Sequence, residues 1–307
     1  MRRKELEFHR NSKMINDRRY GESFVKYFLE PSDCSIRQSQ IFVNVDKREI
    51  LEIELVNNDY ILSSLLNLGR KIYNEAIHKE IVNSQYLYNR KFKLNEHIEI
   101  ANSFREFITY QMWLNPEIES IVKDWVNENP YYGNIQVSEE LYCEPINVYS
   151  FVTLAVTFYM IYSIFRIASK HDIDDMKISN DISFMSIFSD IVRTSSQSYE
   201  SYKAKLNSMR FKEIKDNCIS VLSYILNQNH LTNYFLKIFA DGSVGKVHTT
   251  LLSVATETLI SKICCNSREI STCLNCGNFY VGHGNSYLCI PCRTYKDNHK
   301  HIKTDRN

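Results

Sequence analysis

The sequence predicts a mainly α protein, in which a multi-helix domain follows a small N-terminal β-hairpin. Three observations favour this fold class. Apolar residues recur at helical intervals through most of the chain, they alternate with polar residues in one short region, and only 8 glycines and 5 prolines interrupt 307 residues. The content of 44% hydrophobic and 24% charged residues is typical of a globular chain with a sizeable core.

The first predicted elements are the two strands of the hairpin. Apolar and polar residues alternate over 41–45 and again over 51–55, and the polar residues 46–48 between them suit a turn. One face of this hairpin would be apolar and the other acidic, because Glu52 and Glu54 alternate with the apolar residues of the second strand.

Helical spacing begins at residue 58, where Asn58 or Asp59 is expected to cap a helix whose apolar stripe runs to Ala76. A second stripe covers residues 100–112. Asn115-Pro116-Glu117 is typical of a helix start, and the residues from Pro130 to Gly133 of a helix end. Further helices are predicted over residues 147–169, 181–195, 199–226, 231–239 and 244–264.

Four cysteines near the C-terminus carry the clearest chemical signal. They form two C-x2-C pairs separated by twelve residues, and they are Cys273, Cys276, Cys289 and Cys292. Two such pairs can supply a closed tetrahedral site of four thiolates for a structural Zn²⁺ ion. Two disulfides or four unrelated thiols are the alternatives, and the odd total of nine cysteines disfavours a disulfide framework. Residues 279–281 and 287–288 are expected to form a short strand and its return.

This segment resembles C-terminal zinc-finger modules of bacterial proteins, including the CGNR-type fingers, which read C-x2-C-G-x2-F, a short hairpin and an aromatic-Cys pair. The matching residues are Cys273, Cys276, Gly277, Tyr280, Tyr287, Cys289 and Cys292. The likeness covers about the last forty residues, and Arg293-Thr-Tyr-Lys296 stands where the CGNR group has Gly-Asn-Arg. The resemblance implies a zinc-ribbon-like finger with a DNA-binding, regulatory role.

Positive charge gathers at the two ends of a chain whose formal net charge is only +1. The C-terminal charges beside the cysteines are expected to contact nucleic-acid phosphates, and they are Arg293, Lys296, Lys300, Lys303 and Arg306. The leading hypothesis is therefore a zinc-containing bacterial protein that associates with DNA or RNA or has a regulatory role. The main alternative is a protein-interaction module of a phage-defence or stress complex.

Three further motifs offer enzymatic alternatives. Arg293 and His299 form an R-x5-H pair that resembles the catalytic motif of HEPN ribonucleases. The cluster 171–175 joins a histidine to carboxylates, which a hydrated loop explains equally well. Residues 241–246 have glycines too close for a phosphate-binding loop, and they indicate a helix start capped by Asp241 or Ser243. No motif specifies a reaction, so a role without catalysis is favoured.

The chain is expected to be cytoplasmic, because charged residues instead of an apolar run follow Met1. Residues 145–165 carry no formal charge and are long enough for a membrane span, but their polar residues favour a central helix of a bundle. Three parts are predicted: a basic arm and hairpin over 1–57, a helical domain over 58–268, and the finger with its basic tail over 269–307.

Overall fold

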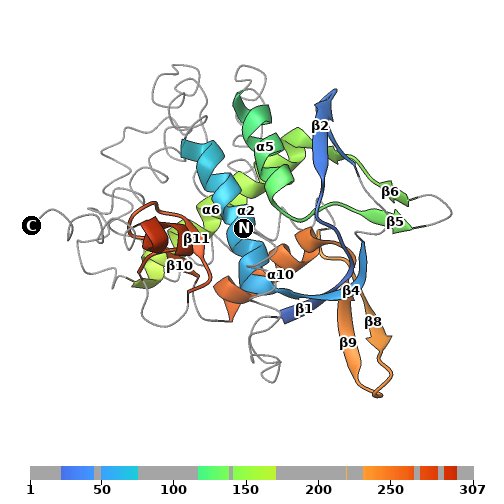
Figure 1. The fold of residues 1–307 in the computed structure, drawn as a ribbon. Coiled ribbons are helices and arrows are strands. Elements are labelled where there is room, and N and C mark those ends of the chain that lie inside the picture. Colours follow the sequence, from blue (N-terminus) through green and yellow to red (C-terminus); the bar gives the residue numbers. More distant parts are fainter. Residues whose placement is uncertain are drawn as a thin grey trace, which may run out of the picture.

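The computed structural model of this protein has a mixed α/β fold (Figure 1), so the predicted mainly α class is wrong. Within the described residues, eleven strands form one four-stranded sheet, one three-stranded sheet and two two-stranded sheets. The structure describes residues 22–44, 50–74, 117–137, 141–170, 219, 231–265, 270–282 and 287–295.

The described helices are α2 (Asn58–Ile72), α5 (Glu117–Glu128), α6 (Val148–Lys170) and α10 (Leu251–Cys264). The longer strands are β1 (Glu22–Phe28), β2 (Asp33–Arg37), β3 (Gln40–Asn44), β4 (Leu51–Asn57), β8 (Tyr234–Ile238) and β9 (Val244–His248). The short strands are β5 (Ile135–Val137), β6 (Leu141–Cys143), β7 (Ile146–Asn147), β10 (Ser271–Thr272) and β11 (Phe279–Tyr280).

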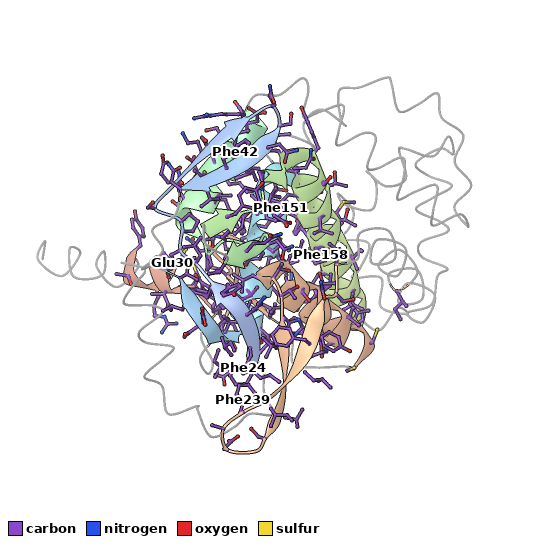
Figure 2. All side chains as sticks on the ribbon, turned by 90° about the vertical axis from the view of Figure 1, so that its right-hand side faces the viewer. Phe24, Glu30, Phe42, Phe151, Phe158 and Phe239 are labelled. Carbon is purple, nitrogen blue, oxygen red and sulfur yellow. The ribbon has the colours of Figure 1, made fainter. Side chains whose placement is uncertain are left out.

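Helix α2 is the centre of the core and packs against α5, α6 and α10. Leu62, Leu65 and Leu66 of α2 are fully buried. Figure 2 shows Phe151 and Phe158 of α6 inside the same mass of side chains, and both are buried. At Gly69, α2 approaches α6 so closely that an added Cβ atom would lie 2.1 Å from the Ala155 carbonyl oxygen. Glycine is needed here because no side chain fits between the two backbones.

Three predicted helices are confirmed in the described residues. Helix α2 begins at Asn58, but its N-cap is Asn57, one residue before the predicted caps, and the Asn57 Oδ1 accepts a 2.9 Å hydrogen bond from the Tyr60 backbone N–H. Helix α5 begins at Glu117 and ends before Pro130. Helix α6 takes the place predicted over 147–169, and its buried residues confirm a core helix.

The strands predicted over 41–45 and 51–55 correspond to β3 and β4, but their predicted pairing with each other is wrong. β3 pairs with β2 and β7, while β4 pairs antiparallel with β1. The predicted apolar face of the second strand is also wrong, because Leu51 and Leu55 are exposed and Val56 is buried. Alternation within a strand identifies the strand but does not identify its partner.

The helix predicted over 231–239 is wrong, and so is the first part of the one predicted over 244–264. These residues form β8 and β9, and β9 lies parallel to β1 in a sheet of order β4-β1-β9-β8. The predicted helix start at 241–243 is instead the turn of this hairpin, where Gly242 has a φ of 79° and the Asp241 Oδ1 accepts a 3.0 Å hydrogen bond from the Ser243 N–H. Helix α10 begins only at Leu251, after the N-cap Thr250.

Other predictions lie outside the described residues. These are the basic arm before residue 22, the stripe over 100–112, the acidic cluster 171–175, the helices over 181–195 and 199–226 apart from Ile219, and the tail after Tyr295. None of the helices that the structure describes combines the length and the apolar character that a membrane crossing requires.

A buried polar cluster joins β9 to α10. The His248 side chain is 1% exposed, its Nδ1 lies 2.9 Å from the Ser253 Oγ, and its Nε2 lies 3.3 Å from the Glu257 Oε2. The same carboxylate accepts a 2.6 Å hydrogen bond from the Lys246 Nζ. Because Ser253 is also fully buried, this chain of contacts holds the sheet against α10 and does not offer a reactive hydroxyl.

We expect the protein to lose stability as the pH falls below about 6.5, the ordinary pKa of histidine. Burial and the nearby Lys246 lower the pKa of His248, against an opposing effect of Glu257. The unfolded chain therefore takes up a proton at this position at a higher pH than the folded chain does, and folding becomes less favourable. Urea unfolding between pH 7.5 and pH 5.5 measures the effect, with those values set roughly either side of the ordinary histidine pKa.

The control for this pH dependence is His248→Gln, which has no proton to gain at residue 248. The variant should lose less of its stability across the acidic range than the parent protein loses, whatever its stability at neutral pH. An identical loss in both proteins would contradict the role given to His248.

Candidate metal centre

The first cysteine pair lies in a tight turn between β10 and β11. The Cys273 N–H donates a 2.9 Å hydrogen bond to the Asn278 carbonyl, and the Gly277 N–H donates one of 2.9 Å to the Cys273 carbonyl. Directly after the pair, Gly277 has a φ of 72°, in the left-handed region that favours glycine. We name residues 270–295 the knuckle.

The second pair is held by a short helical turn at 290–295, where the Arg293 N–H donates a 3.0 Å hydrogen bond to the Cys289 carbonyl. The predicted return strand over 287–288 is wrong, because β11 pairs with β10 instead. A backbone hydrogen bond of 3.0 Å from the Leu274 N–H to the Tyr287 carbonyl joins the two halves of the knuckle.

These turns bring the four predicted sulfur ligands together. All four sulfur atoms lie within 4.8 Å of one another, and those of Cys276 and Cys289 are 3.7 Å apart. Zn–S bonds of about 2.3 Å in a tetrahedral site place neighbouring sulfurs roughly 3.8 Å apart. The cluster therefore has the size that a four-thiolate metal site requires, and the side chains present fit a metal ion.

The thiol groups differ in how readily they ionise. Burial would raise the pKa of Cys273, but backbone N–H groups of Cys276, Cys289 and Asn275 point at its sulfur and bring the pKa down to about 6. Burial raises the pKa of Cys289, and the neighbouring sulfurs raise it further against the backbone N–H of Cys292. One thiolate therefore forms easily, while several can coexist only beside a cation that offsets their charge.

No protein-family model, curated protein or solved structure matches this chain. The four cysteines are compatible with a zinc-finger-like module near the C-terminus. The resemblance to CGNR-type fingers rests on the sequence motif alone. Of the predicted phosphate contacts, Arg293 is exposed on the short helical turn, while Lys296, Lys300, Lys303 and Arg306 lie outside the described residues.

The knuckle is docked onto the helical core and does not project from it on a linker. The Asn67 side chain of α2 binds the backbone of Phe279 twice: its Nδ2 donates to the Phe279 carbonyl at 2.9 Å, and its Oδ1 accepts from the Phe279 N–H at 2.7 Å. Asn67 thus takes the place that a neighbouring strand would take beside β11. The Phe279 ring is buried against Tyr159 and Tyr162 of α6.

Two arginines and one tyrosine complete this docking. Arg70 of α2 donates to the Asn278 Oδ1, and Arg166 of α6 donates to the Thr272 Oγ1. The Tyr162 hydroxyl accepts a 2.8 Å hydrogen bond from the Ile270 N–H. Both helices therefore contact the strands on either side of the first cysteine pair, and the knuckle with its cysteine cluster packs against α2 and α6.

Sequence reasoning identified the sulfur ligands and missed the residues that hold them in place. Asn67 lies inside the predicted helix as a half-buried polar residue on the core side of α2. A polar residue within an apolar stripe signals a buried hydrogen bond. That signal was present in the sequence, but it does not say that the partner is 212 positions away.

We expect Asn67→Ala to destabilise the protein by about 2 kcal/mol, because two hydrogen bonds are lost and the Phe279 backbone groups lose their partners. Hydrogen exchange should accelerate at the Phe279 amide, which then has no protein acceptor. Chemical unfolding gives the change in the free energy of unfolding. Hydrogen exchange monitored by NMR shows whether the Phe279 amide has lost its protection.

Asn275→Ala is the matched control, because Asn275 is exposed on the knuckle and its Nδ2 donates to the Cys292 sulfur at 3.3 Å instead of to the Phe279 backbone. This substitution should leave the Phe279 amide protected. Equal protection of that amide in Asn67→Ala and in the parent protein would refute the docking role.

Proposed function

We propose that Cys273, Cys276, Cys289 and Cys292 hold a structural zinc ion, and that the outer face of the knuckle binds nucleic acid. Zinc is the proposed metal because four thiolates in a tetrahedral arrangement favour it over the harder cations. The ion would fill its coordination sphere with the four sulfurs and leave no position for water, so its role is structural and not hydrolytic.

The observation that carries the nucleic-acid proposal is the composition of the outer face. Large side chains are exposed there next to an exposed arginine, Arg293. The exposed fractions are 79% for Leu274, 70% for Tyr287, 43% for Ile290 and 62% for Tyr295. Aromatic rings and arginine side chains are the groups on which unpaired bases stack.

Charge supports the same proposal. Residues 270–295 contain no aspartate or glutamate, so no carboxylate of the knuckle repels a phosphate backbone. The sequence then adds Lys296, Lys300, Lys303 and Arg306 against Asp297 and Asp305. Four thiolates around one Zn²⁺ leave a net charge of about −2 at the proposed site, so the positive charge available to a polyanion comes from Arg293 and from the sequence after Tyr295. Basic residues and exposed rings are the combination found in proteins that bind single strands.

Binding of a fluorescently labelled single-stranded oligonucleotide tests the proposal. The zinc-loaded protein should bind it with an affinity that falls as salt increases. Tyr287→Ala should weaken binding by roughly 5- to 100-fold, the loss expected for one stacked base. Arg293→Ala should weaken binding and also reduce its salt dependence, because one phosphate contact disappears.

Arg37→Ala is the matched control, because Arg37 is an exposed arginine on β2, and Figure 1 places β2 and the knuckle at opposite sides of the molecule. It should leave the affinity unchanged. If folded, zinc-loaded protein shows no salt-dependent binding to single-stranded or double-stranded DNA or RNA, the nucleic-acid proposal fails. A protein partner for the same exposed side chains then becomes the better explanation.

A further inference from the structure

The β8–β9 hairpin carries the most exposed of the large apolar side chains in the four-stranded sheet. Figure 1 shows this hairpin extending away from the helices, with β8 at the edge of the sheet. The exposed fractions are 50% for Tyr234, 70% for Leu236 and 73% for Ile238 on β8, and 63% for Val244 on β9. Lys237 is the only charged residue of β8, whereas edge strands are commonly protected by several charges, a proline or a bulge.

The four most exposed of these residues share one face of the hairpin, whereas Phe235, which is 38% exposed, lies on the other. Residues alternate between the two faces of a strand, so Tyr234, Leu236 and Ile238 lie on the same side. Val244 is the cross-strand partner of Ile238 and therefore lies on that side too. On the opposite face, Phe239 covers Gly245 and its ring centroid lies 4.7 Å from that of Phe24, which Figure 2 shows at the same end of the molecule.

The hydrogen-bond pattern of the hairpin shows which backbone groups of β8 face outward. Asn233 accepts from the Thr249 N–H at 3.0 Å, and the Phe239 N–H donates to the Ser243 carbonyl at 2.8 Å. In an antiparallel ladder the bonded pairs alternate, so Phe235 and Lys237 bond toward β9 as well. The N–H and C=O groups of Tyr234, Leu236 and Ile238 therefore point to the open edge, where no strand lies within the described part of the chain.

We propose that β8 pairs antiparallel with β8 of a second copy of this chain, across a two-fold axis at Leu236, and joins the two four-stranded sheets into one. In this register Tyr234 of one copy lies opposite Ile238 of the other, and Leu236 lies opposite its own equivalent. Every outward N–H and C=O group of the three residues then finds a partner. The apolar residues of both copies meet on one face.

Side-chain charge and backbone pairing favour the register with the axis at Leu236 over registers with the axis at a neighbouring residue. With the axis at Leu236, Lys237 of one copy lies opposite Phe235 of the other, so the ammonium group meets an aromatic ring. Moving the axis to Lys237 would place two lysines directly opposite each other, which is unfavourable. Moving it to Phe235 would leave the outward groups of Ile238 without a partner on the neighbouring strand. A parallel arrangement in register would also bring the two lysines together.

The mass of the zinc-loaded 307-residue chain in solution tests the proposal. It is measured by sedimentation equilibrium over a concentration series. We expect a dimer of twice the 36.2 kDa chain mass at high concentration. Leu236→Glu places two carboxylates opposite each other at the axis and should raise the dimer dissociation constant at least about tenfold. Phe235→Glu places each new carboxylate opposite Lys237 of the other copy, so this variant should remain dimeric.

The control is Leu274→Glu, which changes an equally exposed leucine on the knuckle and should not alter the mass. Circular dichroism confirms that each variant is folded before its mass is compared. A parent protein that stays monomeric at every concentration overturns the proposal, and so does a folded Leu236→Glu variant that remains as dimeric as the parent. Loss of dimerisation in folded Phe235→Glu overturns the register and with it the proposed axis. None of these outcomes depends on nucleic-acid binding by the knuckle.

Discussion

Cys273→Ser should lower the free energy of unfolding by about 4 kcal/mol or more, and the melting temperature by roughly 10 °C. Cys273 is buried, and its sulfur is one of the four that lie within 4.8 Å of one another. Without it the site is open and the remaining thiolates repel one another. The knuckle then loses the ion that supplies most of its local folding energy, because Phe279 and Ile270 are among its few buried apolar residues.

Scanning calorimetry of the reduced protein measures this effect, and metal analysis of the same sample should fall from one zinc per chain to well below one. Cys264→Ser is the matched control, because Cys264 is an exposed thiol at the end of α10 that lies outside the sulfur cluster. Its substitution should change stability by less than about 0.5 kcal/mol. Equal melting temperatures for the two variants would show that the sulfur cluster does not stabilise the fold.

Gly69→Ala should destabilise the protein by about 3 kcal/mol, although alanine is the better helix former. The new Cβ would lie 2.1 Å from the Ala155 carbonyl oxygen and 2.6 Å from the carbonyl carbon, so α2 and α6 must move apart. Alanine gains about 1 kcal/mol over glycine in a helix, which is less than the cost of separating two packed backbones. Thermal and urea unfolding measure the net change.

Two further variants separate this steric effect from helix propensity. Lys71→Ala changes an exposed residue of the same helix and should leave stability within about 0.5 kcal/mol. Ala155→Gly should not rescue Gly69→Ala, because the contact is with the backbone of residue 155 and not with its side chain. A Gly69→Ala variant as stable as the parent would mean that the two helices do not cross at this distance.

The sequence was sufficient to predict the elements whose information is local. The apolar stripes of α2, α5 and α6 repeat over several turns, and the sequence Asn115-Pro116-Glu117 predicts the start of α5 at Glu117. The C-x2-C spacing likewise predicted that the four sulfurs cluster, because the chemistry of a metal site fixes the distance between paired cysteines. In each case residues that are neighbours along the chain determine the outcome.

The fold class was wrong because the strands depend on partners far away in the chain. β1 begins at Glu22, outside the predicted hairpin, and it lies between β4 and β9, which are some 190 positions apart. β8 is a short, largely apolar run and β9 is equally short, and periodicity alone does not distinguish such short segments from helix. The aromatic and β-branched residues of β8, together with the Asp241-Gly242-Ser243 turn, were the available signals for a hairpin.

The docking of the knuckle through α2 has a consequence for the life of the protein in a cell. Asn67 and Arg70, which contact the knuckle, lie on the same helix as Gly69, which contacts α6. If the knuckle folds only around the proposed ion, a newly made chain without that ion leaves this side of its central helix uncovered. On the proposed function, metal supply would therefore set the fraction of chains that are open at this helix, and with it the amount of protein that cellular proteases remove.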